Sequence, residues 1–463
     1  MPTLPRATWA DFTYAGGFRL PRKWKMDKNG NNGNFLSSRG GIGIADENHL
    51  YVQGYVYPKL MAVAKVPIKL SKGLFEDLPV IDPSEIGEFL DIESNVEMGD
   101  NNHVKNRMTS MYIHNGYLIG SLAHNYDSNG KDQQFTWRSK NGVVEGLFSN
   151  EGAYHSLGWI TDVPLEWQET LGCAHIMGGG HNYSISGRAS IGPTAFGVDL
   201  DQITADVVVE PVKTTTFMDY DHKKGYSLCG TKYPELEIQH GYQNFRYNCV
   251  QVKDPAYPVD AHNRVSWPEQ GPTLGNDIWI GFPRVGCGFI IPGTCTYAVI
   301  GTMYGMEHGA GYRIRNDKGV QSSGPSPYVQ SDWSHYVWLF DVNDWLEVKA
   351  GTKEPHEMLP YEHHPIDIPV TNPTGLEGTR DGNRAPIKNG CVIGNRVYLS
   401  MQAADSSQPL IVAFDAALGG VVAPPIEPPV VPPIIEPPVI DPVAEATQAA
   451  HDAIDNLVTV LGK

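Results

Sequence analysis

The 463-residue sequence lacks several patterns that mark large classes of protein. It has no run of about 18 apolar residues, so we expect no transmembrane helix and no membrane insertion. Residues 1–17 have no apolar core of signal-peptide length, which predicts synthesis in the cytoplasm without a cleaved leader. The six cysteines form no CxxC pair, so a zinc site is not expected. No Lys/Arg cluster offsets the net charge of −17, which disfavours nucleic acid as a partner.

Common catalytic and metal-binding motifs are also missing. The sequence has no H-E-x-x-H, no phosphate-binding Gly loop and no G-x-S-x-G, because residues 187–192 (GRASIG) have the wrong spacing. Residues 27–34 and 127–132 are rich in Asp, Asn and Gly, but they lack the central Gly and closing Glu of a calcium loop. Turn chemistry explains their composition. We therefore expect no cofactor, with calcium in these two segments as the alternative.

One strand–turn–strand unit recurs five times along the chain. Its copies lie at residues 41–54, 110–121, 217–230, 289–301 and 391–400. Each copy places a tyrosine at the same point of its second strand: Tyr51, Tyr117, Tyr226, Tyr297 and Tyr398. Recurrence of one hairpin over a long chain is typical of a repeat architecture.

A second recurring element is a closing strand, which in most copies runs into an Asp-containing turn. It begins at residues 62, 195, 248, 337 and 411, and the first copy lacks the Asp. Blades of about 40–50 residues with long insertions account for the spacing of both elements. The sequence therefore predicts an all-β fold, a β-propeller of five to seven blades. A β-sandwich is the alternative, although sandwich domains are usually near about 100 residues.

The predicted propeller head covers residues 1–419. Residues 12–21 form a strand ahead of the first complete repeat, and the last repeat lies at residues 391–418. Closed propellers often complete one blade with strands from both ends of the chain, which removes the exposed sheet edge. We therefore expect the first strand to pair with the last hairpin. Helix is expected only near the C-terminal end.

A proline-rich stalk and a short helix follow the predicted head. Residues 420–442 contain the string PPIEPPVVPPIIEPPVIDP, which favours extended polyproline II. Residues 443–463 predict an amphipathic α-helix with apolar positions at heptad spacing. A lone helix has no core of its own, so this stripe predicts oligomerisation, with docking onto another protein as the alternative. The stripe consists of Val443, Ala446, Ala450, Ala453, Ile454, Leu457, Val460 and Leu461.

Histidines and aromatic residues mark a candidate site in or near predicted loops. A His–Tyr–Arg set can abstract a proton from a uronic acid and neutralise its carboxylate, as a polysaccharide lyase requires. That catalytic alternative involves His175, His181, Tyr183, Arg188 and His222. The same residue types also make an ordinary sugar-binding surface, for which the candidates are Asp219, Tyr220, His222 and Arg188. Loop residues with purely structural partners are the third interpretation.

The repeats, together with the string VWLFDVNDWLEVKAGTKEPHEMLPY at residues 337–361, resemble a loose group of β-propeller proteins of bacteria and their phages. The proline stalk and terminal heptads resemble phage fibre or appendage architecture. This resemblance implies a virion structural protein on the particle surface that binds a host-surface glycan or receptor. It further implies a homotrimer, held to other virion proteins by the C-terminal helix. The alternatives are a carbohydrate-active enzyme similar to polysaccharide lyases, and a scaffold propeller that binds a protein partner.

Overall fold

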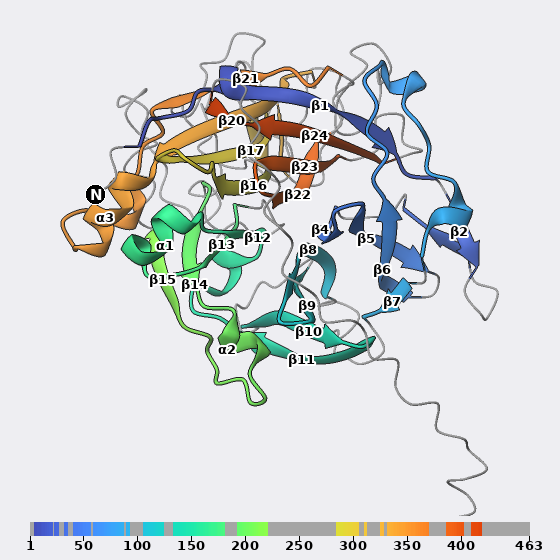
Figure 1. The fold of residues 1–463 in the computed structure, drawn as a ribbon, viewed down its shortest axis with the longest axis horizontal. Coiled ribbons are helices and arrows are strands. Elements are labelled where there is room, and N and C mark those ends of the chain that lie inside the picture. Colours follow the sequence, from blue (N-terminus) through green and yellow to red (C-terminus); the bar gives the residue numbers. More distant parts are fainter. Residues whose placement is uncertain are drawn as a thin grey trace, which may run out of the picture. The chain divides into compact units, whose positions relative to one another are not determined.

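The computed structural model describes residues 4–21, 23–26, 32–35, 40–56, 59–87, 89–92, 105–124, 133–180, 192–220, 284–304, 310–312, 325–327, 331–369, 386–401 and 409–418. These residues form five antiparallel sheets arranged around a common centre, which confirms the predicted β-propeller and fixes the number of blades at five (Figure 1). The chain divides into two units, residues 1–426 and 427–463, and all described residues belong to the first.

Each blade has four strands that follow one another along the chain from its inner to its outer edge, except in blade 4, where β18 and β19 intervene, and in blade 5, where the chain ends meet. Blade 1 contains β4 (Ile42–Asp46), β5 (His49–Val56), β6 (Lys59–Pro67) and β7 (Phe89–Asp91). Blade 2 contains β8 (Lys105–His114), β9 (Tyr117–His124), β10 (Gln134–Lys140) and β11 (Val143–Ser149). Blade 3 contains β12 (Trp159–Asp162), β13 (His175–Gly178), β14 (Ala195–Val198) and β15 (Thr214–Met218).

The last two blades complete the circle. Blade 4 contains β16 (Arg284–Ile290), β17 (Thr296–Tyr304), β20 (Trp333–Asp341) and β21 (Glu362–Ile366). Blade 5 contains β22 (Ile387–Ile393), β23 (Arg396–Met401), β24 (Leu410–Ala416) and β1 (Phe12–Arg19). Two more strands extend blade 1 beside β5, namely β2 (Lys23–Met26) and β3 (Asn32–Asn34). A separate two-stranded ribbon is formed by β18 (Ala310–Tyr312) and β19 (Pro325–Pro327).

The predicted closure is confirmed, because the first strand of the chain completes the last blade. In blade 5, β1 pairs antiparallel with β24 from Phe12↔Ala416 to Arg19↔Leu410. The preceding segment also ties down blade 4: the Cys295 backbone N–H donates to the Pro5 carbonyl at 3.0 Å, and the Tyr361 hydroxyl donates to the Ala7 carbonyl at 2.6 Å. The N-terminal residues therefore join two blades and cover an edge that would otherwise be open.

Short polar turns set the register of the blade 2 hairpins. Asn115–Gly116 joins β8 to β9 and Asn141–Gly142 joins β10 to β11, all four with positive φ (50°, 75°, 52° and 78°). Such two-residue Asn-Gly turns match the twist of antiparallel strands. The Asp-containing turns after third strands act differently. Asp341 caps the helix that follows β20 by accepting a hydrogen bond from the Asn343 backbone N–H at 2.9 Å.

Inner strands approach one another closely at the centre because they carry glycine there. A Cβ atom on Gly43 of β4 would overlap the carbonyl oxygen of Met111 in β8. A Cβ on Gly390 of β22 would lie 2.7 Å from the Cβ of Cys287 in β16. Glycine is therefore required at these two positions by the close approach of neighbouring blades.

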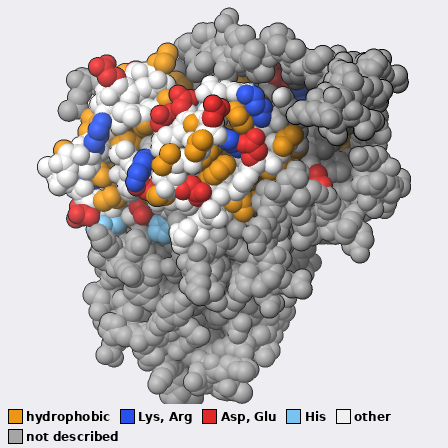
Figure 2. Space-filling view, turned by 90° about the horizontal axis from the view of Figure 1, so that it is seen from below, with side chains coloured by type: hydrophobic (Ala, Val, Ile, Leu, Met, Phe, Trp, Pro, Cys, Tyr) orange, Lys and Arg blue, Asp and Glu red, His pale blue; other side chains and the backbone are white. Residues whose placement is uncertain are grey.

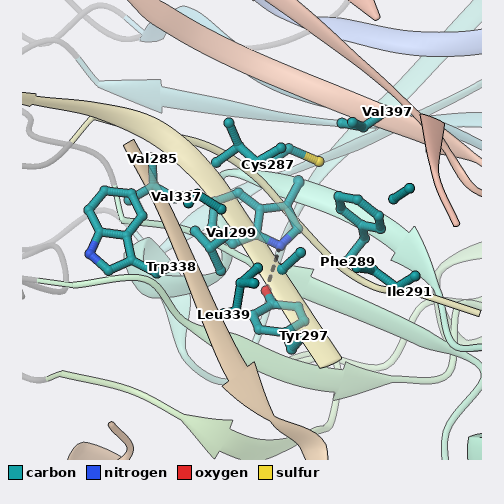
Figure 3. Close-up of a cluster of buried hydrophobic side chains, with 14 of the residues drawn as sticks. Val285, Cys287, Phe289, Ile291, Tyr297, Val299, Val337, Trp338, Leu339 and Val397 are labelled. Carbon is teal, nitrogen blue, oxygen red and sulfur yellow. Dashed lines mark hydrogen bonds between the residues drawn. The ribbon is translucent and has the colours of Figure 1, made fainter. Parts of the chain in front are cut away.

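The largest hydrophobic cluster joins blades 3, 4 and 5. Figure 3 shows side chains of β16, β17 and β20 packed together, with the Tyr297 hydroxyl accepting a hydrogen bond from Trp159 Nε1 at 3.0 Å. Trp345, from the helix after β20, stacks on Phe217 at 5.1 Å between ring centroids and meets Tyr297 edge-on at 4.8 Å. The third and fourth blades are thus held together by large aromatic side chains.

Several expectations need correction or lie outside the described residues. Helix is not confined to the C-terminal end, because the head contains α1 (Leu165–Leu171), α2 (Asp201–Thr204) and α3 (Val342–Lys349). It also contains single 3-10 turns: η1 (Trp9–Asp11), η2 (Phe75–Asp77), η3 (Pro83–Glu85), η5 (Ala153–Ser156) and η9 (Pro355–Glu357). No helix within the described ranges is long and apolar enough to span a membrane. The stalk, the terminal helix with its eight stripe residues, and Tyr226 lie outside the described residues.

Candidate functional site

The two ends of the propeller differ in the connections that leave them. All five inner strands run in the same direction. We call the end of the propeller at which these strands begin the "entry end". The opposite end, at which they finish, is the "turn end". At the entry end, strands are connected by residues 92–104, 125–133, 179–194, 219–283, 305–332 and 367–386. At the turn end, four of the five inner hairpins close over residues 47–48, 115–116, 291–295 and 394–395, whereas the outer connections 68–88, 199–213 and 342–361 are long. The two longest connections, residues 219–283 and 305–332, both leave the entry end, and loops on a rigid scaffold often carry binding residues.

Asp219, a predicted binding residue, follows β15 at the entry end of blade 3. Its Oδ1 atom lies 2.7 Å from Nδ1 of His155, and both side chains are mostly buried. The main chain of each partner is fixed by a further hydrogen bond. The Asp219 N–H donates to the Pro355 carbonyl at 3.1 Å, and the Thr194 hydroxyl donates to the His155 carbonyl at 2.6 Å. An imidazole oriented by a carboxylate is an arrangement that general bases use. The sequence analysis did not identify His155, whose partner lies 64 residues away.

Tyr220 is completely buried, and its hydroxyl donates a short hydrogen bond to the Met358 carbonyl. The ring also packs over Gly192, where an added Cβ would lie 2.7 Å from Tyr220 Cδ2. The side chain therefore contributes to packing between blades 3 and 4. Its predicted role in ligand binding stays a prediction.

His175 lies at the turn end, away from the other two described candidates, Asp219 and Tyr220. It opens β13 and pairs with Val198, whereas Asp219 directly follows Met218, which pairs with Ala195 at the opposite end of β14. The three residue steps from His175 to Gly178 span about 10 Å of strand. The structure therefore does not bring His175 and Asp219 together. The other candidates, His181, Tyr183, Arg188 and His222, lie outside the described residues.

His175 instead belongs to a titratable cluster at the junction of blades 2 and 3. Its ring meets the rings of Tyr112 and His114 edge-on, at centroid distances of 5.4 and 4.9 Å. Its Nε2 atom lies 3.9 Å from Asp162 Oδ1, and the Tyr112 hydroxyl donates a short hydrogen bond to the same oxygen. His114 Nε2 lies 2.7 Å from Asp201 Oδ1. Four separate segments thus build this cluster.

The electrostatics of the cluster follow from burial. The side chain of His175 is 9% exposed, and desolvation together with the neighbouring His114 lowers its pKa to about 4. Its Nδ1 atom is buried without a hydrogen-bond partner. The hydrogen bond from His114 lowers the pKa of Asp201, while burial and the Asp162 carboxylate hold the pKa of Tyr112 well above its usual value. At neutral pH the cluster therefore keeps His175 uncharged beside the ionised carboxylate of Asp201, while burial raises the pKa of Asp162.

Carboxylates on the described inner strands occur only at the turn end, as Asp46 of β4 and Asp162 of β12. Glycoside hydrolysis uses a pair of carboxyl groups on either side of the bond that breaks. The described inner strands supply no such pair at the entry end. In the described ranges, moreover, no three His, Cys, Asp or Glu residues are arranged to bind a metal ion. The two predicted calcium segments lie mostly outside those ranges.

No protein-family model and no curated protein matches the sequence. A candidate glycoside hydrolase from Parabacteroides distasonis is similar in structure over 90% of this chain and 94% of its own, at 9% identity and a TM-score of 0.35. A structure from the GH130 family of mannoside phosphorylases, which contains glycoside hydrolases that target β-1,2 mannosidic linkages in Candida mannan, covers 88% of this chain and 96% of its own, at 11% identity and a TM-score of 0.33.

The PQQ domain of a pyranose dehydrogenase from Coprinopsis cinerea covers 89% of this chain and 98% of its own, at 11% identity and a TM-score of 0.26. The chain therefore has a weak structural resemblance to glycoside hydrolase-like proteins. Identities and TM-scores this low carry no function across. None of these comparisons bears on the phage-like features of the sequence.

Proposed function

We propose that this propeller binds carbohydrate at its entry end. The observation that carries the proposal is that the two longest connections, residues 219–283 and 305–332, leave that end, above inner strands that pack closely at Gly43 and Gly390. The ligand would then be held by loops on a rigid support, as in many binding proteins.

The composition of the longest entry-end connection supports a sugar ligand. Residues 219–283 are rich in aromatic residues that have polar handles, and in Asn, Gln and His. Tyrosine and tryptophan offer an apolar face and a hydrogen-bonding edge, which suits a sugar ring with one apolar face and many hydroxyl groups. Apart from the buried Tyr220, the tyrosines and tryptophans of this connection are Tyr226, Tyr233, Tyr242, Tyr247, Tyr257, Trp267 and Trp279.

A glycan array probed with the intact chain tests this proposal. We expect retention of a limited set of glycans, and weaker retention by Trp267→Ala and Trp279→Ala. A matched control is Trp9→Ala, in η1, which precedes β1 and therefore lies at the turn end. Circular dichroism would verify that each variant folds. A chain that retains no glycan on the array or in calorimetry, or whose retention survives both entry-end substitutions, would overturn the proposal.

A carbohydrate-active enzyme is the second candidate, and the His155–Asp219 pair favours it. The pair lies at the entry end and has the form of an oriented general base. A lyase that uses this base would produce unsaturated uronate ends, which absorb ultraviolet light. Incubation with uronate polysaccharides should then give such ends with the intact chain and not with His155→Gln. Glycan binding without any new ends would restrict the function to binding.

The tail suggests how such a head would be displayed. The proline-rich stalk and heptad stripe are consistent with attachment to a phage particle through a trimeric C-terminal helix. Light scattering of the full chain and of Ile454→Asp with Leu457→Asp tests this. We expect a trimer that becomes a monomer, because the substitutions place charges in the seam. A monomeric full chain would exclude self-association through the helix.

A further inference from the structure

On the described surface seen in Figure 2, acidic and basic side chains lie intermingled. Hydrogen bonds between buried residues, by contrast, converge on the His155–Asp219 pair. One of these residues is Thr194, which is completely buried and directly precedes β14. Its hydroxyl donates to the His155 carbonyl at 2.6 Å and accepts a hydrogen bond from the Gly179 N–H at 2.7 Å. The Thr194 side chain therefore ties the main chain of His155 to the end of β13.

The two residues that hold His155 lie side by side on the sheet of blade 3. Thr194 directly precedes Ala195. Asp219 directly follows Met218, which pairs with Ala195 across β14 and β15. Thr194 holds the main chain of His155, and Asp219 holds its imidazole at Nδ1. Because the strand pairing fixes the spacing between these two supports, it also limits how the imidazole can turn.

Thr194 is held in turn by Tyr297 of blade 4. The Tyr297 hydroxyl donates to the Thr194 carbonyl at 2.9 Å, and it accepts from Trp159 Nε1 the hydrogen bond drawn in Figure 3. Glycine at position 288 makes room for this hydroxyl, since an added Cβ would overlap it. A buried chain of hydrogen bonds thus runs from blade 4 through Tyr297 and Thr194 to His155.

Tyr297 is one of the recurring tyrosines, and its contacts differ from those of its counterpart in blade 5. Tyr398 occupies the corresponding place in β23, where its hydroxyl interacts with Arg396 of the same strand. Tyr297 instead joins blade 4 to the segment that carries the candidate base. The tyrosine of blade 5 therefore provides a matched control for the tyrosine of blade 4.

We infer that Thr194 and Tyr297 are positioning residues, which hold the His155 imidazole against Asp219 in the orientation that a general base requires. This inference rests on the enzymatic candidate of the proposed function and adds two residues to it. An ionised carboxylate can only accept hydrogen bonds, so Asp219 keeps the proton of the neutral imidazole at Nδ1 and the lone pair at Nε2. Loss of either support would let the ring turn, and both tautomers would then be populated.

Nuclear magnetic resonance of the full chain with isotopically labelled histidine tests the inference, because ring-nitrogen shifts report which nitrogen carries the proton. His155→Gln identifies the signals of His155. At pH 8, we expect the wild type to hold the Nδ1-protonated tautomer, and Thr194→Val and Tyr297→Phe to show a mixture of both tautomers. Thr194→Ser keeps the hydroxyl and should restore the wild-type tautomer.

Two controls remove hydroxyl groups elsewhere. Tyr398→Phe changes the corresponding tyrosine of blade 5, and Thr296→Val removes a completely buried hydroxyl at the turn end of blade 4. Both should keep the wild-type tautomer of His155, and circular dichroism would verify that each variant folds. In the ultraviolet assay for unsaturated uronate ends, Thr194→Val should lower the rate by at least about tenfold, whereas the two controls should change it by less than about threefold.

The outcomes separate the inference from the proposed function. A folded Thr194→Val or Tyr297→Phe with the wild-type tautomer would overturn the inference, and so would a wild type in which His155 carries its proton at Nε2. An unchanged rate in Thr194→Val, despite mixed tautomers, would likewise overturn it. A wild type that forms no unsaturated ends, while the tautomers behave as expected, would overturn the enzymatic candidate and support the positioning of His155.

Discussion

Replacement of His175 by glutamine should remove part of the dependence of stability on pH. The imidazole is buried at the junction of blades 2 and 3, where the groups facing it are Tyr112, His114, Asp162 and Asp201. Burial and His114 lower its pKa in the folded protein to about 4, although Asp201 acts in the opposite direction. An unfolded chain exposes the same side chain with a pKa of about 6.5.

The sign of the effect follows from these two values. Between about pH 6.5 and pH 4 the unfolded chain binds a proton at this position more readily than the folded protein does. Acidification therefore favours unfolding, and the free energy of unfolding falls as pH decreases through this window. From pH 8 to pH 5 the loss amounts to about 2 kcal/mol, because each unit of pKa difference corresponds to about 1.36 kcal/mol. The paired carboxylate of Asp201, with its lowered pKa, loses its contribution only at lower pH.

Urea unfolding of the wild-type chain and of His175→Gln at several pH values between 8 and 5 measures the effect. The wild type should lose about 2 kcal/mol more than the variant over this range. His356→Gln is the control, since it removes a histidine from the short turn η9, outside the buried cluster. Identical pH dependence in the wild type and His175→Gln would refute the burial argument.

Three further changes test the architecture. Deletion of residues 1–21 should abolish cooperative thermal unfolding or cause aggregation, because it opens the β24 edge; a soluble, cooperatively folding truncation would contradict this. Gly43→Ala should destabilise by about 1–3 kcal/mol in urea because its Cβ meets Met111, whereas the exposed Gly87→Ala has room and should change little; equal effects would argue against close inner-strand packing. Truncation after Gly420 should leave the β signal in circular dichroism unchanged and yield a monomer by light scattering, and loss of the β signal would show that the head needs its tail.

Much of the fold was predictable because four blades repeat one local pattern. Tyr51, Tyr117, Tyr297 and Tyr398 all lie in the second strands of their blades, as the sequence predicted. In blade 3 the closing strand predicted from residue 195 is β14, but the hairpin predicted at residues 217–230 begins in the outer strand β15. The inner hairpin of this blade escaped detection, because its second strand, β13, has no tyrosine and α1 interrupts the hairpin. The sequence analysis treated the segment around β13 as a loop, although residues 175–178 form a strand buried in the sheet. A local pattern cannot reveal a hairpin whose strands are separated by a helix.

The candidate sites were less predictable, since their residues converge only through the tertiary fold. His175 was identified as a loop residue, yet its neighbours Tyr112 and His114 come from another blade. The His155–Asp219 pair likewise joins distant segments.

The position of β24 determines how the propeller would bear mechanical load. Any tension applied through residues that follow Leu418 enters the fold at this strand, which is paired along its length with β1 on one side and β23 on the other. A strand held on both sides cannot be peeled from an edge, so its two ladders would have to shear together. Survival under force depends on the rate of unfolding rather than on equilibrium stability. The strand pairing of β24 with β1, which closes the propeller, would thus also slow the unfolding of a propeller that is pulled from its C-terminal side.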